Sequence, residues 1–476
     1  MRPNSILRPS QRALMTQMAY FPDGIAVMGM GGGKTAATLF SIDDCLEEGD
    51  YDHAFIFAPP NTLRNAWALE PTRWEGLSDL SVEILDGSPA QREAILARAD
   101  ADVYVMSSDI STWLVNLMQK WNRRKTPMFD LSRVHIVIDE ISKMSSPQSK
   151  RGNKMLWLTR RAAGTWGLTG TPRPNRYEDL FLPIKLVGGE SVWGHSGFDD
   201  WRRELFRPTD YTARNWEIHD FAVPIVEKIA KTFMFYAPPD DLQVPEVVTT
   251  DVPVYMNSDQ IAHYEMMQET LVAEGVIPDL YGDELNEWLI EAGSAGVASG
   301  KLVQIVQGFI YDTVGKTVVH VSTAKLAALY KLDDDLMGSP ALLMYGLLEE
   351  KRQLEGMCVD KGYRYAVMGD GVTAAAKDAA VRDWINGDLD RIIAHPASMG
   401  HGTDGLQHGG HHIVWYHPTW SSEQYFQTIA RLARPGQKHV VQNYRLLAQE
   451  TLDLVKVQRV ARKREEELAF IERMAD

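Results

Sequence analysis

A glycine-rich string near the N-terminus ends in a lysine and a threonine, residue types that are suited to binding phosphate. The glycines let the backbone curl so that its N–H groups point at phosphate oxygens, and a helix starting at Thr35 would add the positive end of its dipole. The Lys34 ammonium would then reach the β- and γ-phosphates, and the Thr35 hydroxyl would bind Mg²⁺. The predicted ATP-binding loop consists of Gly31, Gly32, Gly33, Lys34 and Thr35.

Two adjacent carboxylates follow the apolar run in VHIVIDE. The run predicts a buried strand over 134–139, whose end would present Asp139 and Glu140 at the edge of a parallel sheet beside the phosphate loop. We expect Asp139 to hold Mg²⁺ through water, and Glu140 to orient and deprotonate the attacking water. The alternative is that the pair only caps a helix after the strand, a common role for acidic pairs.

The string QTIARLARPGQ near the C-terminus places two arginines three residues apart. On a helix this spacing puts Arg431 and Arg434 on one face, one turn beyond Gln427. Guanidinium groups stabilise the charge that spreads over the γ-phosphoryl oxygens, by about 10³–10⁵ in rate. Two nucleotide-binding folds closing on one ATP would explain why these arginines lie so far along the chain from Lys34. The predicted catalytic residues are Glu140, Arg431, Arg434 and Lys34.

Length and composition limit the classes of protein that this chain can form. Its 476 residues, 45% of them hydrophobic, suit two or more cores at about 100–200 residues per domain. No apolar run approaches the roughly 20 residues of a membrane span, and the opening residues do not resemble a secretory signal. Two cysteines, Cys45 and Cys358, argue against a disulfide framework. We expect a reduced, cytoplasmic protein with no membrane partner.

The formal net charge of −15 leans against nucleic-acid binding, because phosphate contacts need local positive potential. The basic residues are bunched, however, so an acidic exterior with a basic groove is one interpretation, and solvated turns are the other. The bunched positions are 123–125, 150–151, 160–161 and 202–203.

Short apolar runs alternate with helical patterns in two parts of the chain, which predicts an α/β fold with two doubly wound parallel-sheet lobes. Between about residues 185 and 335 the pattern lapses, and helical insertions are expected there. The predicted strands are 25–30, 53–59, 82–86, 102–107, 134–139 and 165–170 in the first part, and 340–346, 363–368, 391–396 and 411–417 in the second.

Prolines and acids at 237–246 mark the expected hinge between the lobes. We therefore predict an N-terminal ATP-binding lobe over 1–238 and a C-terminal lobe over 239–476. The expected helical insertions cover about 190–235 in the first lobe and about 258–335 in the second. Charge and apolar spacing predict a last helix over about 450–474.

Six further strings lie along the chain: LRPSQ (7–11), FAPPNTLRNAW (57–67), VMSSD (105–109), DEISKMSSPQSKR (139–151), LTGTPRPN (168–175) and ASMGHGTDGLQ (397–407). With them the chain resembles superfamily 2 helicase-type ATPases, and within these the switch/sucrose-nonfermenting (Snf) double-stranded DNA translocases. LTGTPRPN is the most specific to that subfamily. The compact chain is similar to a bacterial or phage member of this subfamily.

The resemblance implies two RecA-like lobes that use ATP and Mg²⁺ to move along duplex DNA. Little sequence specificity is expected, because tracking a backbone needs phosphate contacts rather than base readout. The resemblance gives Gln11 an adenine-reading role and adds Gln427 to the ATP-binding set. Residues implied in coupling are Thr169, Gly170 and Thr171. Residues implied in DNA contacts are Asn61, Thr62, Arg64, Ser107, Ser108, Ser398 and His401.

The resemblance also extends to the insertions, which would be the family's two protrusions, one from each lobe. The last helix would brace the lobes, with a coiled-coil partner site as the alternative, and we expect a monomer. The chain departs from the family pattern in three places: Ser142 replaces a histidine that usually couples the lobes, Ser421 and Ser422 replace an Asn-Pro pair, and Ala430 replaces a glycine.

Two other functions stay open from the sequence. A strand-separating DNA helicase could use the same scaffold, although it would need a wedge at a fork. A nucleotide-dependent recruitment subunit of a larger nuclease or packaging complex is the second, although Glu140, Arg431 and Arg434 argue against a dead ATPase.

Overall fold

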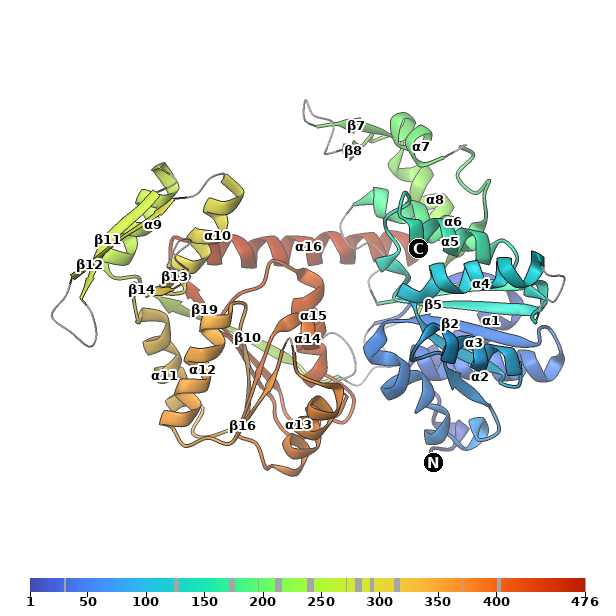
Figure 1. Ribbon diagram of the computed structural model, residues 1–476, viewed down its shortest axis with the longest axis horizontal. Helices are drawn as coiled ribbons and strands as arrows, with labels where there is room; N and C mark the ends of the chain where they lie inside the picture. The colour runs from blue at the N-terminus through green and yellow to red at the C-terminus, as the bar shows by residue number, and fades with distance from the viewer. Residues whose placement is uncertain are drawn as a thin grey trace. The chain divides into compact units, whose positions relative to one another are not determined.

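The computed structural model consists of two compact units (Figure 1). Unit 1 contains Met1–Gln243 and Glu465–Asp476, and unit 2 contains Val244–Arg464. The structure describes residues 1–29, 31–123, 128–170, 176–195, 197–209, 216–237, 244–270, 272–278, 285–291, 295–311, 317–369, 371–399 and 404–475, with only the backbone for Asn61, Ala475 and the residues from 270 to 299.

Unit 1 is built on a seven-stranded sheet with every pair parallel, in the order β3-β4-β2-β5-β6-β1-β9. The first six strands lie where the apolar runs predicted them, whereas three-residue β9 is too short to give such a run. The strands are β1 (Asp23–Val27), β2 (His53–Ala58), β3 (Val82–Ile84), β4 (Val103–Ser107), β5 (Val134–Asp139), β6 (Gly164–Thr169) and β9 (Met234–Tyr236).

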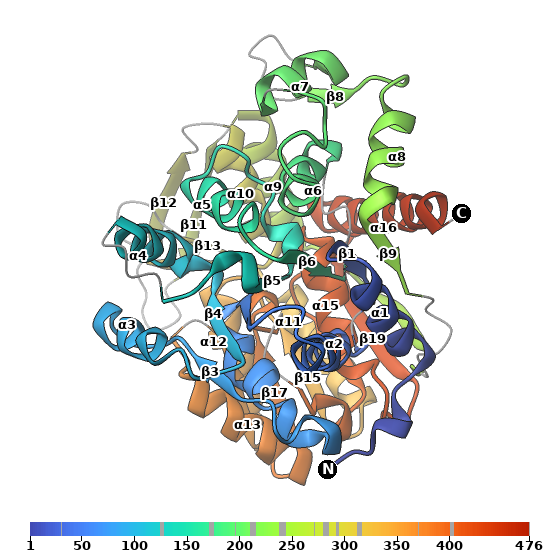
Figure 2. The same cartoon turned by 90° about the vertical axis from the view of Figure 1, so that its right-hand side faces the viewer.

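Helices cover both faces of this sheet, because alternate strand residues point to opposite sides (Figure 2). In β2, Phe55 and Phe57 enter one apolar core, and Ala54 and Ile56 enter the other. The first core includes residues of α3 (Pro89–Arg98), α4 (Ser111–Arg123), α5 (Lys150–Thr159) and α6 (Phe181–Gly188), and the second includes α1 (Pro9–Tyr20) and α2 (Lys34–Glu48).

Unit 2 contains a six-stranded parallel sheet in the order β10-β19-β18-β15-β17-β16. β10 and β19 were not predicted from the sequence. Most of β10 is exposed and carries threonines, an aspartate and a proline, so it lacks an apolar run. The strands are β10 (Val247–Val254), β15 (Ala341–Met344), β16 (Tyr365–Met368), β17 (Arg391–Ala394), β18 (His412–Trp415) and β19 (Val441–Ala448).

The helices of unit 2 again lie on both faces of the sheet. In β15, Ala341 and Leu343 pack with α11 and α12, and Leu342 and Met344 pack with α13, α14 and α15. The helices are α11 (Ala324–Asp335), α12 (Leu348–Asp360), α13 (Ala374–Asn386), α14 (Pro396–Met399) and α15 (Ser422–Leu432).

The two insertions contain helices, as expected, and also antiparallel hairpins that the sequence analysis did not predict. β11 packs against α9 in unit 2 (Figure 1). In the first insertion the elements are α7 (Phe198–Leu205), β7 (Phe206–Pro208), β8 (Trp216–Ile218) and α8 (Val223–Phe233). In the second they are α9 (Ser258–Thr270), β11 (Val272–Pro278), β12 (Leu285–Glu291), α10 (Ala295–Val306), β13 (Phe309–Tyr311) and β14 (Val318–His320).

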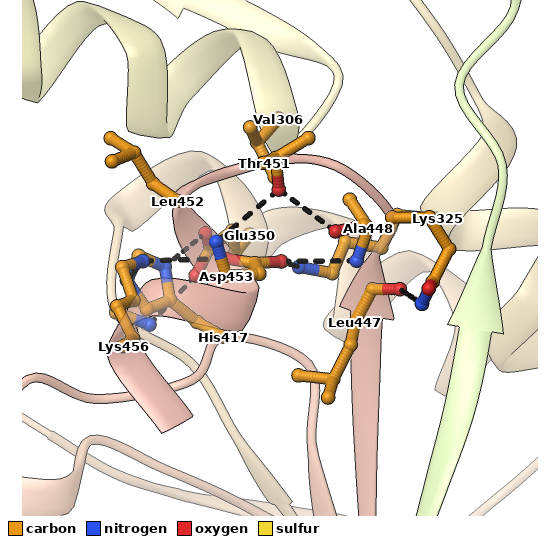
Figure 3. A network of polar contacts seen from close by, with 12 residues as sticks. Val306, Lys325, Glu350, His417, Leu447, Ala448, Thr451, Leu452, Asp453 and Lys456 are labelled. Atoms are coloured by element: carbon orange, nitrogen blue, oxygen red, sulfur yellow. Dashed lines mark hydrogen bonds and ion pairs between the residues drawn. The ribbon is translucent and has the colours of Figure 1, made fainter. Parts of the chain in front are cut away.

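The last helix, α16 (Leu452–Ala475), begins in a buried polar network of unit 2 (Figure 3). Lys325 Nζ lies 2.6 Å from Asp453 Oδ2, and Lys456 donates to His417 Nε2 at 3.2 Å. His417 Nδ1 donates to Glu350 at 2.7 Å. Burial raises the pKa of Asp453, but the two ammonium groups outweigh it, so the pKa lies below its usual range. These ion pairs fix the start of α16, and its last residues pack in unit 1.

A second buried ion pair in unit 2 ties the end of α11 to β17. The Arg391 guanidinium is fully buried and donates to Asp333 Oδ1 at 2.7 and 3.1 Å, and to the carbonyls of Ser339 and Asp390. Tyr363 donates to the other Asp333 oxygen at 2.9 Å. Every part of this pair is hydrogen-bonded, so removing one partner leaves an uncompensated charge.

We expect Arg391→Met to lower the free energy of unfolding by about 3–5 kcal/mol, because Asp333 would stay buried without its partner. Arg364→Met is the matched control, since Arg364 pairs with Asp390 nearby but is largely exposed. Urea denaturation followed by tryptophan fluorescence measures both. Equal losses in the two variants would contradict the structural role given to the buried pair.

Candidate functional site

The loop between β1 and α2 has the backbone that a phosphate site needs. Gly31 and Gly33 have positive φ angles of 74° and 77°, and a Cβ on Gly33 would collide with neighbouring side chains. Both positions therefore favour glycine. α2 begins at Lys34, so Thr35 is its second residue, and the first N–H groups of the helix lie at the loop. The Lys34 ammonium donates to the Met28 carbonyl at 2.8 Å, within the loop.

Two side chains from the start of α1 hold the same loop. The Gln11 amide donates to the Gly33 carbonyl at 3.1 Å, and the Arg8 guanidinium donates to the Gly31 carbonyl at 3.0 Å. The Gln11 oxygen accepts the Arg8 backbone N–H at 3.0 Å, so bonds at both ends orient the amide. Gln11 thus lies against the phosphate loop. Sequence reasoning missed Arg8, although it stands inside the LRPSQ string.

The carboxylate pair lies at the end of β5. Asp139 is the last residue of the strand, and Glu140 follows it in the left-handed region, with φ of 53°. The Trp67 indole N–H donates to Asp139 Oδ2 at 3.0 Å, and the Glu140 backbone N–H donates to Oδ1 at 3.1 Å. Burial raises the pKa of Asp139, and the Trp67 N–H and the positive charge of Lys34 oppose that rise. Sequence reasoning missed Trp67, which lies in the FAPPNTLRNAW string.

The end of β6 connects the loop to the carboxylates, because β6 lies between β5 and β1 in the sheet. The Thr169 carbonyl accepts the Met28 backbone N–H at 3.1 Å. The Thr169 hydroxyl donates to Ser142 Oγ at 3.2 Å, and both side chains are buried. Ser142, where the family pattern has histidine, thus contacts one of the predicted coupling residues. Gly170 follows directly, and Thr171 lies outside the described residues.

This group of residues fits a nucleotide phosphate with a divalent cation. Lys34 supplies positive charge, and hydroxyl and carboxylate oxygens such as those of Thr35 and Asp139 are the ligands that Mg²⁺ prefers. A buried carboxylate with a raised pKa is a group that a cation stabilises. Thr35 and Asp139 are the residues that would hold the ion, which supplies charge to the phosphoryl oxygens when bound.

The predicted arginines form a separate group inside unit 2. Arg431 lies in α15 and is buried, whereas Arg434 lies beyond the end of that helix, which stops at Leu432 before Pro435. The expectation that one helix carries both arginines is therefore wrong. They are brought together by Asp404, whose Oδ1 contacts the Arg431 guanidinium at 3.1 Å and also pairs with Arg434.

Two further contacts position the side chains of α15. Arg431 Nε donates to the Met399 carbonyl at 2.8 Å, which ties α15 to α14. Gln427 is buried and donates to Glu423 one turn earlier at 2.9 Å. Sequence reasoning missed Asp404, although an acidic residue in the ASMGHGTDGLQ string before two arginines was an available signal.

The residues predicted to contact DNA in unit 1 follow two adjacent strands. β2 and β4 pair in parallel with Ala58 opposite Ser107, so the loops after them lie at one edge of the sheet. Asn61 and Thr62 lie in the short helix η2 (Pro60–Thr62), and Ser108 begins η6 (Ser108–Ile110).

Several of these side chains already have partners within the protein. Arg64, in the π-helix η3 (Leu63–Ala68), is largely exposed and pairs with Asp86 at 2.7 Å. Ser107 Oγ accepts the backbone N–H of Asp109 at 3.2 Å. In the predicted basic clusters, Arg151 pairs with Asp109 at 3.0 Å and Arg203 with Asp200 at 2.6 Å. A phosphate would have to compete with these carboxylates.

Of the two predicted DNA contacts in unit 2, Ser398 is the one that lies among the described residues. Ser398 lies in α14 and is buried, with 8% of its surface exposed. His401 lies outside the described residues.

Among the parts of the chain that the structure describes, no helix has the length and apolar character of a membrane span.

A glycine loop closed by lysine, a carboxylate pair on a nearby strand and a second parallel sheet carrying paired arginines define an ATPase of helicase superfamily 2. The family description "SNF2-related domain" matches residues 14–289 of the chain. The chain therefore belongs to the SNF2-related family and is an ATP-hydrolysing enzyme.

The chain is also similar to individual proteins of known sequence or structure. "Putative protein p41" of Acyrthosiphon pisum secondary endosymbiont phage 1 is 27% identical, over 96% of both chains. The ISWI chromatin-remodeling complex ATPase ISW1 of Saccharomyces cerevisiae is 22% identical over 92% of this chain, which spans only 38% of that protein. The Sulfolobus solfataricus SWI2/SNF2 ATPase core, solved in complex with dsDNA, is 18% identical, with a TM-score of 0.42 over 96% of this chain and 91% of that one.

We expect Arg434→Ala to lower ATP turnover by about 10³-fold or more and to change the melting temperature little, because Arg434 is held mainly through Asp404. Arg431→Ala should lower both, because the buried Arg431 also holds the Met399 carbonyl. Arg445→Ala, which removes a pair with Asp251 in the same unit, is the control and should leave turnover unchanged. Steady-state hydrolysis and thermal melting measure these effects. Full turnover in Arg434→Ala would remove that arginine from the catalytic set.

Proposed function

We propose that this protein is an ATP-driven motor that moves along duplex DNA or remodels nucleoprotein on it, with little sequence preference. The observation that carries the proposal is the arrangement at one edge of the unit 1 sheet. The loops after β2 and β4, where the family resemblance places DNA contacts, follow strands that pair beside β5, which ends in the carboxylates of the ATP site. The residues that contact DNA and the residues that hydrolyse ATP would thus be carried by the same rigid sheet.

The proposal gives each residue of the site a role. Lys34 would bind the phosphates of ATP, Thr35 and Asp139 would hold Mg²⁺, and Glu140 would activate the attacking water. Arg431 and Arg434 stabilise the transferring phosphoryl group when the two units close on one nucleotide. Release of the products reopens the site, and repeated closing steps the protein along the backbone.

The loops of unit 1 supply hydroxyl, amide and guanidinium groups for phosphate oxygens, from Asn61, Thr62, Arg64, Ser107 and Ser108. Because Arg64 is paired with Asp86, phosphate binding at this position exchanges one anion for another. The resulting contact is electrostatic, so we expect binding to weaken steeply with salt. The yeast relative is a chromatin-remodeling complex ATPase, which supports a duplex substrate.

We expect low basal ATP turnover, little stimulation by single-stranded DNA and strong stimulation by blunt duplex DNA. The physical reason is that the loops after β2 and β4, which would hold the duplex, lie at the same end of the sheet as Asp139, so that duplex binding would be coupled to the ATP site. Steady-state hydrolysis under the three conditions measures this, with Glu140→Gln as the blank. Equal turnover under all three conditions would refute the duplex-motor proposal and would favour a recruitment role with a protein partner.

A further inference from the structure

Trp67 lies in an element of uncommon geometry between the DNA-contact loop and the ATP site. The chain leaves β2 at Ala58, passes through η2, and forms the π-helix η3 over Leu63–Ala68. π-helical segments are rare and occur frequently at functional sites. η3 also contacts β3 and β4, which lie on the other side of β2 from β5 in the sheet.

The inner side of η3 contacts Asp139 directly. Trp67 is fully buried, and its indole N–H donates to Asp139 Oδ2 at 3.0 Å. The contact arises because β2 and β5 are paired neighbours, with Phe57 opposite Ile138. The other oxygen, Oδ1, accepts the Glu140 backbone N–H. One donor on each oxygen fixes the plane of the carboxylate, and only the donor on Oδ2 comes from another element.

The outer side of η3 carries Arg64, three residues before Trp67. Its side chain is 69% exposed and pairs with Asp86, beyond β3. A phosphate that takes the place of Asp86 would pull on the outer side of a helix only six residues long. Because the indole is packed in the apolar core under α1 and α2, it can follow such a shift only by moving relative to Asp139.

We propose that Trp67 is a positioning residue that orients the Asp139 carboxylate toward Mg²⁺ and links this orientation to duplex binding at η3. The inference rests on the proposed function for its second half only. Loss of the N–H leaves a buried carboxylate oxygen with one fewer donor. Partners that orient a metal ligand typically change metal affinity or activity by about 10–100-fold when they are removed.

The alternative is that Trp67 has only a structural role, as one of several large apolar side chains that pack in the same core. Trp74 offers a matched control for this alternative. It is buried in the same core, and its indole N–H donates to Glu70 Oε1 at 2.8 Å. Trp67→Phe and Trp74→Phe therefore remove the same group from a similar environment, but only the first touches Asp139.

The test measures the affinity of the full chain for a fluorescent ATP analogue, in Mg²⁺ and in EDTA, with and without saturating duplex. In Mg²⁺, Trp67→Phe should weaken the affinity by about 10-fold or more, and added duplex should no longer change it. In EDTA, Trp67→Phe should match the wild type, because Asp139 acts on the nucleotide through the ion. Trp74→Phe should match the wild type under all four conditions.

A second substitution guards against a folding defect. Incorporation of 3-benzothienylalanine at position 67 keeps the shape of the indole and replaces its N–H with sulfur, so it should reproduce the Mg²⁺-dependent loss with normal melting behaviour. Wild-type affinity in that variant, or equal losses in Trp67→Phe and Trp74→Phe, would overturn the positioning role. If duplex does not alter nucleotide affinity or turnover in the wild type, the proposed function and the link to η3 fail together. The comparison in Mg²⁺ without DNA then still decides whether Trp67 positions Asp139.

Discussion

The Asp139 carboxylate is buried at the end of β5 and is held by two N–H donors, the Trp67 indole and the Glu140 backbone amide. Burial of a charged group is costly unless hydrogen bonds or an opposite charge offset it. Here the two donors and the charge of Lys34 offset it only partly, since the pKa of Asp139 remains raised. A divalent cation would remove the rest of this cost. Asp139, the proposed metal ligand, is thus a group whose charged form a bound cation would stabilise.

The register of the unit 1 sheet makes this arrangement possible. Because β2, β5, β6 and β1 are neighbours and all run the same way, the segments that follow them meet at one edge. Thr169 at the end of β6 contacts both the phosphate loop and Ser142, and Trp67 beyond β2 contacts Asp139. In unit 2 the same principle places Asp404, beyond β17, beside the arginines that follow β18.

Much of this fold could be predicted from the sequence because buried parallel strands are continuous apolar runs. VHIVID shows the principle, since all but its last residue are buried in the structure. The same reasoning failed for β10, an exposed strand whose threonines and aspartate give no apolar run. It also placed Arg434 on a helix, because arginine spacing says nothing about where Pro435 ends that helix.

Some side chains of the candidate site could likewise be predicted from the sequence, and others could not. Gly33, Lys34 and Asp139 were predictable, because phosphate and metal chemistry restricts these positions to particular residue types. Trp67 and Arg8 were not, because each contacts a residue that is distant in the sequence, and Asp404 had only the signal of an acidic residue before two arginines. Only the pairing of β2 with β5 shows that a tryptophan after one strand meets a carboxylate at the end of another.

Displacement of a third strand from blunt duplex DNA tests the central claim most directly, because it reports movement along intact duplex rather than hydrolysis alone. We predict that the protein displaces a triplex-forming strand in an ATP-dependent manner, without a single-stranded tail, and that Glu140→Gln does not. Displacement only from substrates with a single-stranded tail, or none despite ATP hydrolysis, would contradict translocation on duplex DNA.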